Sequence, residues 1–137
     1  MQGAEFYECG RLKLVTGETG CGKSHVVKEW LRSKPQNGER VVVVGIPEEY
    51  EEFFWRPDVV VVSCRDAELN KYLRRSDAVK LADVVVLDMI PYALSEVVLR
   101  LLTNTNCRMI LVCTEGPDAL NMPLELQWER KSSFSEA

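Results

Sequence analysis

One short segment constrains this chain more than any other. Residues 17–24 fit the pattern G-x-x-x-x-G-K-[ST] at every position, with an apolar run before them and helical periodicity after them. A glycine-rich turn between a strand and a helix lets successive backbone N–H groups surround an anion, and the helix N-terminus adds its positive dipole end. This context predicts a loop that binds the phosphates of a nucleoside triphosphate.

The loop contains the side chains that such a site requires. We expect Lys23 to reach the β and γ phosphates and the Ser24 hydroxyl to coordinate Mg²⁺. The residues predicted to bind the nucleotide are Gly17, Glu18, Thr19, Gly20, Cys21, Gly22, Lys23 and Ser24. A chance match in a glycine-rich turn is the alternative, and the flanking strand and helix argue against it.

Short apolar runs recur along the chain, each about five residues long and without alternation. They are Leu12–Thr16, Val41–Ile46, Val59–Ser63, Val84–Asp88 and Met109–Cys113. Such runs are typical of strands buried on both faces of a parallel sheet. Helical periodicity follows the phosphate loop and also marks the segments Ala67–Leu81 and Leu94–Leu102. The pattern predicts an α/β fold of three layers, with a central, mainly parallel five-stranded sheet and helices on both faces.

A second candidate site residue, Asp88, ends the fourth apolar run. In nucleotide-hydrolysing sheets an acid at this place holds Mg²⁺, and ligands bind at the carboxyl ends of parallel strands. We therefore expect Asp88 to act with Lys23 in catalysis and with Ser24 in binding the metal. The alternative is that Asp88 is a turn or helix-capping residue.

The next position lacks the carboxylate that hydrolysis normally uses to orient and deprotonate water. It is occupied by Met89, which cannot act as a base. The remaining candidates are Glu48, Glu49 and Glu115, and each has the alternative of a solvated surface carboxylate. The sequence therefore predicts nucleotide binding, with enzymatic hydrolysis left uncertain.

Composition narrows the class of protein. The chain is 46% hydrophobic and 28% charged with a formal net charge of −4, which argues against a protein that coats nucleic acid. Five cysteines without a CxxC pair suggest neither a disulfide framework nor a zinc site. The first ten residues lack a signal-peptide pattern, and no apolar run approaches the roughly 20 residues of a membrane span. We expect an intracellular protein, cytoplasmic or nuclear, that is neither secreted nor membrane-bound.

Several motifs resemble those of DEAH-type superfamily 2 RNA helicases. The segment Val15–Ser24 is very close to their first motif, in which G-E-T-G-[SC]-G-K-[ST] is common. Asp66–Asp88 resembles the segment that ends in their second motif, and Arg108–Thr114 stands where a strand ends in S-A-T. The resemblance covers about residues 6–120 and implies a RecA-like P-loop domain over 1–120, with 121–137 as a partly disordered C-terminal tail. It also implies ATP and Mg²⁺ as ligands, and RNA or another helicase-domain chain as a partner.

The later motifs differ from those of the family. Where D-E-A-H is expected, the chain has Asp88-Met89-Ile90-Pro91, and Gly45–Glu49 is acidic where the family carries a basic RNA-contacting motif. These differences favour an ATP- and Mg²⁺-binding helicase-like domain with weak or absent autonomous hydrolysis and unwinding. The main alternative is a small oligomeric motor ATPase, such as a viral genome-packaging or FtsK/HerA-like protein. A neighbouring subunit would then supply an arginine, for which the candidates are Arg74, Arg75 and Arg100.

Two further alternatives stay open. A nucleoside or small-molecule kinase fits the phosphate loop but lacks a lid of clustered arginines. An interaction module that uses nucleotide as a structural ligand would bind it without turnover. Three consecutive aromatic residues, Phe53, Phe54 and Trp55, either stack on bases or pack beneath the edge of the sheet.

Overall fold

The computed structural model describes residues 3–18, 20, 22–34, 38–65, 69, 72, 77–88, 100–101, 103–114 and 127–134. The strands are β1 (Glu5–Cys9), β2 (Leu12–Thr16), β3 (Val41–Gly45), β4 (Val59–Ser63), β5 (Val84–Asp88), β6 (Arg108–Cys113) and β7 (Glu129–Lys131). The helices are α1 (Lys23–Ser33), the 3₁₀ helix η1 (Pro47–Phe53) and α3 (Asp77–Lys80). No described helix combines the length and the apolar character needed to cross a lipid bilayer.

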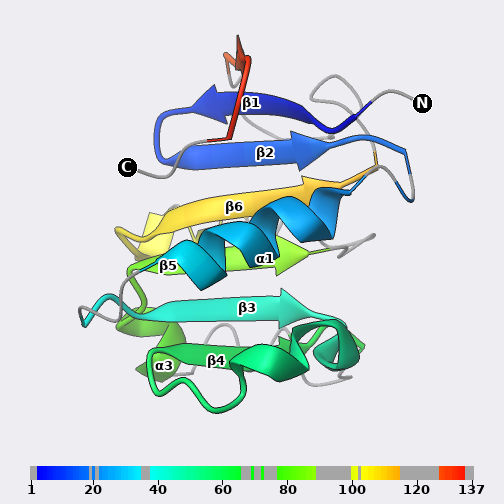
Figure 1. Ribbon diagram of the computed structural model, residues 1–137. Coiled ribbons are helices and arrows are strands. Elements are labelled where there is room, and N and C mark those ends of the chain that lie inside the picture. The colour runs from blue at the N-terminus through cyan, green and yellow to red at the C-terminus, as the bar shows by residue number, and fades with distance from the viewer. Residues whose placement is uncertain are drawn as a thin grey trace.

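The strands form one mixed sheet in the order β4-β3-β5-β6-β2-β1-β7 (Figure 1). The first five strands in this order run parallel to one another, whereas β1 is antiparallel to both β2 and β7. The register pairs Asp88 with Val112 and Thr16 with Cys113. The carboxyl ends of β2, β5 and β6 therefore lie at the same edge of the sheet.

The prediction of a three-layer RecA-like fold with a mainly parallel five-stranded sheet is wrong. The sheet has seven strands and is mixed, and the described residues form few helices. The two additional strands have no unbroken apolar run, because β1 contains two glutamates among its five half-buried residues and β7 consists of three charged residues. Both lie at one edge of the sheet, where burial is partial and a strand does not need to be apolar throughout.

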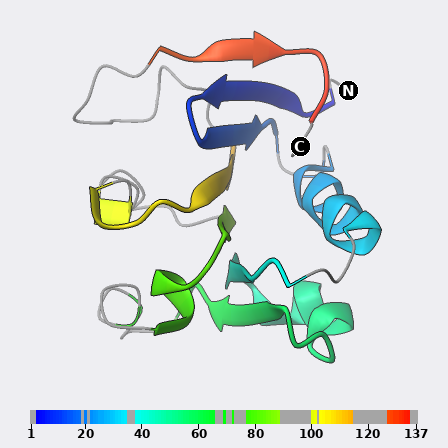
Figure 2. The ribbon, with the colours of Figure 1, turned by 90° about the vertical axis from the view of Figure 1, so that its left-hand side faces the viewer.

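The central strands are buried because both of their faces are covered. Alternate residues point to opposite faces of a strand, so consecutive valines supply two cores. On one face, Val43, Val86 and Ile110 pack with Val27 and Leu31 of α1. On the other, residues such as Leu87 and Leu111 pack with Val79 of α3. Figure 2 shows α1 and α3 on opposite sides of the sheet.

The predicted helices are described in part. The helix expected after the phosphate loop is α1. It ends at Ser33, because the backbone of Lys34 is extended. Within Ala67–Leu81 the structure describes the short helix α3 and a few single residues, and only residues 100 and 101 of Leu94–Leu102 belong to the described ranges. The division between residues 1–120 and 121–137 stays a prediction, although β7 and Phe134 lie within the second range and pack on β1.

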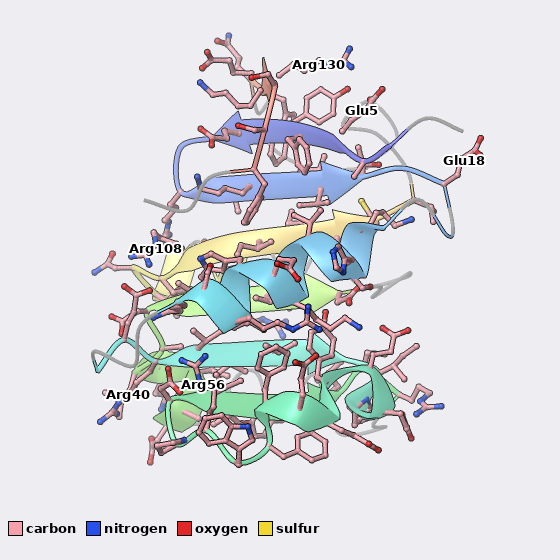
Figure 3. All side chains as sticks on the ribbon, in the orientation of Figure 1. Glu5, Glu18, Arg40, Arg56, Arg108 and Arg130 are labelled. Carbon is pink, nitrogen blue, oxygen red and sulfur yellow. The ribbon has the colours of Figure 1, made fainter. Side chains whose placement is uncertain are left out.

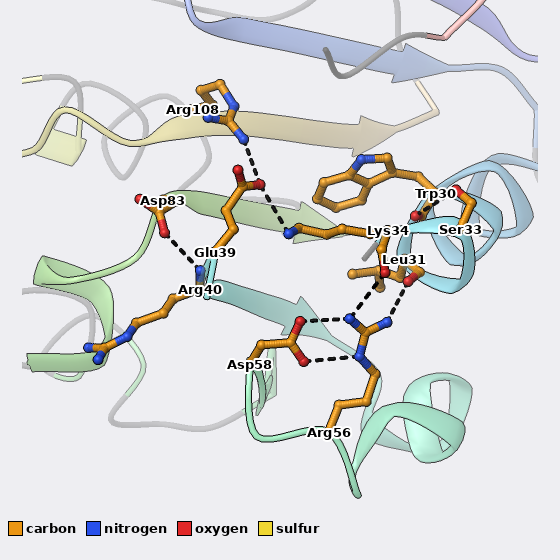
Figure 4. A network of polar contacts seen from close by, with 10 residues as sticks. All are labelled: Trp30, Leu31, Ser33, Lys34, Glu39, Arg40, Arg56, Asp58, Asp83 and Arg108. Atoms are coloured by element: carbon orange, nitrogen blue, oxygen red, sulfur yellow. Dashed lines mark hydrogen bonds and ion pairs between the residues drawn. The ribbon is translucent and has the colours of Figure 1, made fainter. Parts of the chain in front are cut away.

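A polar network ties the end of α1 to the starts of the central strands (Figure 4). Arg56 donates to both carboxylate oxygens of Asp58, at 3.0 and 2.6 Å, and to the Leu31 carbonyl at 2.6 Å. Glu39 accepts ion pairs from Lys34 at 3.2 Å and from Arg108 at 2.7 Å. The network lies at the amino ends of β3 and β5, at the opposite edge of the sheet from Asp88, so it supports the fold rather than the candidate site.

Candidate functional site

The phosphate loop leaves β2 and turns sharply before α1 begins. Gly20 and Gly22 have φ values of 87° and 98°, which place their backbones in the left-handed region. A Cβ atom added at either residue would meet nothing within 4 Å, so the backbone conformation, and not crowding, favours glycine here. Thr19 and Cys21 lie outside the described residues, and Glu18 projects outward at the bend of the loop (Figure 3).

The N-terminus of α1 has the properties of an anion site. Gly22 is the N-cap residue, and no side-chain hydrogen bond caps the helix at this residue. The first turn contains no acidic residue that would compete for the positive end of the helix dipole. Backbone N–H groups at such a terminus lack partners within the helix, so they are available to a phosphate.

Lys23 is the first residue of α1 and is 7% exposed. Its Nζ donates a hydrogen bond of 2.5 Å to the carbonyl oxygen of Gly17, across the loop. An ammonium group has three N–H donors, so this bond accounts for only one of them. Lys23 thus closes the loop on itself and keeps a positive charge beside the glycines.

Ser24 and Asp88 are brought together from two distant segments. The Ser24 hydroxyl, in the first turn of α1, donates to Asp88 Oδ2 at the end of β5 over 3.1 Å. A hydroxyl that donates its single proton keeps both lone pairs on oxygen. Ser24 can therefore hold its bond to Asp88 and coordinate a cation at the same time.

Asp88 is a buried carboxylate with one unpaired oxygen. Its side chain is almost wholly buried, and Oδ1 has no hydrogen-bond partner among the described residues. Burial raises the pKa of Asp88, and hydrogen bonds from Tyr50 and Ser24 oppose that rise. An unpartnered buried oxygen of a charged group costs free energy, on the order of a few kcal/mol, which a bound cation would offset.

Sequence reasoning missed Tyr50. The Tyr50 side chain is fully buried in η1, and its hydroxyl donates to Asp88 Oδ2 at 2.5 Å. Burial raises the pKa of Tyr50, and the Asp88 carboxylate raises it further, so the phenol remains a hydrogen-bond donor at neutral pH. Only the aromatic ring within the acidic segment 48–52 could have drawn attention to this residue.

Gly45 at the end of β3 makes room for this contact. A Cβ atom there would lie 3.1 Å from Cε2 of Tyr50 and 3.3 Å from Cβ of Asp88. Distances of this kind are tighter than ordinary van der Waals contact, so a larger residue would push the Tyr50 ring away from Asp88. The missing side chain at the carboxyl end of β3 thus allows the Tyr50 ring to reach Asp88 on β5.

The other predicted residues are not brought together at this site. Glu48 pairs with Arg65 at 3.1 Å in an exposed ion pair. Glu49 is exposed as well, but its charge raises the pKa of Asp88, which places it within electrostatic reach. The predictions for Met89, Ile90, Pro91, Glu115, Arg74 and Arg75 fall on residues outside the described ranges.

The three consecutive aromatic residues differ in burial. Phe53 is buried and packs against Tyr50, with 6.3 Å between the ring centroids. Phe54 and Trp55 are 57% and 70% exposed. Packing beneath the sheet edge therefore applies to Phe53 alone.

The oxygen atoms of Ser24 and Asp88 fit Mg²⁺. This cation prefers oxygen ligands, and proteins usually hold it through one or two carboxylates together with substrate phosphates and water. The described residues contain no group of three or more His, Cys, Asp or Glu side chains that could hold a metal ion. A metal at Asp88 would accordingly depend on phosphate oxygens for part of its coordination.

Comparison with protein-family models, with curated proteins and with solved structures finds no match to this chain. Its function must therefore be inferred from the loop, from the Ser24–Asp88 contact and from the sequence motif that contains them.

Proposed function

We propose that the chain binds ATP together with Mg²⁺ at the carboxyl ends of β2 and β5. The observation that carries the proposal is the hydrogen bond between Ser24 and Asp88, with the unpartnered Oδ1 of Asp88 beside it. This pair joins the phosphate loop to a buried acid at the end of the central strand β5. Neither Ser24 nor Asp88 is part of the hydrophobic core, so packing alone does not account for their contact.

The side chains have separate tasks in this proposal. Backbone N–H groups between Gly17 and Ser24 donate hydrogen bonds to the phosphate oxygens, and Lys23 contributes its ammonium charge to the β and γ phosphates. Ser24 and Asp88 hold the cation on the side of β5. Mg²⁺, when bound, supplies positive charge that neutralises the phosphate oxygens.

Hydrolysis is proposed to be slow or absent. The described residues near Asp88 offer one further carboxylate, Glu49, which is exposed on η1. An exposed carboxylate lacks the fixed geometry of a general base. Met89 follows Asp88 in the sequence and brings no such group.

The test is direct binding of a fluorescent ATP analogue in Mg²⁺. Lys23→Ala should weaken binding at least about tenfold, because a charge-assisted hydrogen bond contributes about 1.5–3 kcal/mol. Lys28→Ala is the matched control, since it removes the same charge from the same helix beyond its first turn. Failure of the wild-type chain to bind, or equal binding by Lys23→Ala, would contradict the proposal.

The choice of ATP over GTP rests on the resemblance to helicases, and competition between the two nucleotides tests it. RNA or a second helicase-domain chain as a partner is proposed on the same basis. Size-exclusion chromatography in ATP separates a lone domain from the alternative of an oligomeric motor, for which a stable ring is expected.

A further inference from the structure

Two hydroxyl groups converge on a single oxygen of Asp88. Ser24 Oγ and Tyr50 Oη both donate to Oδ2, at 3.1 and 2.5 Å, whereas Oδ1 has no partner among the described residues. A carboxylate held at one oxygen by two donors from different directions cannot exchange its oxygens freely. The asymmetry fixes which oxygen is available to a further ligand.

Tyr50 is itself held firmly. Its ring is fully buried among residues of the core that also contains Val27 and Val86. Gly45 lies directly against the ring, where an added Cβ atom would approach Cε2 to 3.1 Å. Tyr50 therefore presents its hydroxyl to Asp88 from a fixed position within the core, whereas Ser24 lies in the first turn of α1.

We infer that Tyr50 is a positioning residue for the metal: its hydroxyl anchors Oδ2 of Asp88 and leaves Oδ1 to meet the divalent cation that accompanies the phosphates. This inference rests on the proposed function. Tyr50 does not touch nucleotide or metal in this role and acts through Asp88. Ser24 alone is a poorer anchor, because its hydrogen bond to Oδ2 is 3.1 Å long, whereas that of Tyr50 is 2.5 Å.

Loss of the Tyr50 hydroxyl should therefore act on the cation and not on the phosphates. Groups that orient a metal ligand typically change metal affinity by 10- to 100-fold when they are removed. Tyr50→Phe keeps the ring and its packing, and deletes only the donor. A purely structural role for the ring predicts no selective effect of this variant on Mg²⁺.

The experiment is a Mg²⁺ titration of binding by the fluorescent ATP analogue. Tyr50→Phe should raise the Mg²⁺ concentration for half-maximal tightening about tenfold. Its affinity for the analogue in EDTA should stay within about twofold of wild type, since the phosphate loop is intact. Tyr7→Phe is the matched control, because it deletes a tyrosine hydroxyl that donates to the carboxylate of Glu5 at 2.9 Å on β1.

A second variant tests the same contact without deleting the hydroxyl. The Cβ atom of Gly45→Ala would crowd both the Tyr50 ring and Cβ of Asp88, so it should disturb their contact and raise the Mg²⁺ midpoint in the same direction. Circular dichroism of each variant shows whether it is folded. If Tyr50→Phe does not fold, the Mg²⁺ midpoint of Gly45→Ala tests the inference in its place.

Each outcome has a defined meaning. An unchanged Mg²⁺ midpoint in folded Tyr50→Phe overturns the inference and leaves the proposed function intact. Equal weakening with and without Mg²⁺ also overturns it, because the ring would then serve the fold alone. Failure of the wild-type chain to bind the analogue at any Mg²⁺ concentration overturns the proposed function and the inference with it.

Discussion

Arg56 and Asp58 form an ion pair of 2.6 Å in which the two side chains are only 5% and 8% exposed. Removing one partner of such a pair leaves the other charge buried and uncompensated, at a cost of about 3–5 kcal/mol. Asp58→Ala should therefore lower the free energy of unfolding by about 3 kcal/mol in urea denaturation. Glu52→Ala, which breaks the exposed pair with Arg32, should cost less than about 1 kcal/mol. Similar losses in the two variants would contradict this expectation.

The same pair gives a pH dependence with a defined sign. Burial raises the pKa of Asp58, but the hydrogen bonds and the charge of Arg56 outweigh it and hold the pKa below its ordinary value of 3.8. Stability from a carboxylate of this kind is present above 3.8 and is lost as the pH falls through the lowered pKa. Wild type should therefore lose more stability than Asp58→Asn between pH 5 and about pH 2. Parallel stability curves for the two proteins would exclude this contribution.

Asp88 should behave in the opposite way. Its pKa is raised by burial, so its contribution to stability is present below its ordinary value of 3.8 and is lost as the pH rises through the raised pKa. Without nucleotide or metal at pH 7, Asp88→Asn should be more stable than wild type by about 1 kcal/mol, a gain that shrinks toward pH 4. The variant should also lose the Mg²⁺-dependent tightening of ATP binding. A variant less stable than wild type at pH 7 would show that the carboxylate serves the fold.

Met89→Glu should introduce ATP hydrolysis. A positioned general base contributes about 10²- to 10⁴-fold to a rate, and the position after Asp88 carries that base in the helicase motif that the sequence resembles. Phosphate release at saturating ATP and Mg²⁺ should rise about 100-fold over wild type. Met89→Gln, which has nearly the same shape and no charge, is the control. Equal activity of the Glu and Gln variants would show that the missing base is not the limiting defect.

Gly22→Ala should weaken both the fold and the loop. The residue has φ 98° and ψ 20°, where a side chain costs about 1–2 kcal/mol. Gly3→Ala is the matched control, because an added Cβ atom meets nothing within 4 Å at either residue and only Gly22 has a positive φ. Thermal melting should separate the two variants, and ATP binding should weaken in Gly22→Ala alone.

The predicted strands were found where the physical signal was strong. Runs such as Val41–Gly45 and Val84–Asp88 are apolar on both faces, and no helix of that length would bury every residue. β1 and β7 were missed because partial burial at an edge imposes no continuous apolar pattern. That omission led to the wrong fold class, since these strands make the sheet mixed.

Only those site residues that their own sequence segment identifies could be predicted. Lys23 and Ser24 belong to a motif whose spacing within the chain determines its geometry, and Asp88 ends a recognisable strand. The contact between Tyr50 and Asp88 spans 38 residues and depends on the pairing of β3 with β5 and on the room left at Gly45. Nothing in the sequence around either residue indicates that the two side chains meet.

The pairing of β1 with β7 also bears on how the protein is made. Phe6 lies opposite Lys131, so the outer edge of β1 stays uncovered until β7, the last of the seven strands, has been synthesised. At ribosomal rates of 5–20 residues per second, that interval lasts roughly 6–25 s. An uncovered strand edge pairs readily with another chain. Neighbouring nascent chains on one messenger RNA can therefore mispair at β1 during this interval, and slower translation of the segment that ends in β7 lengthens it.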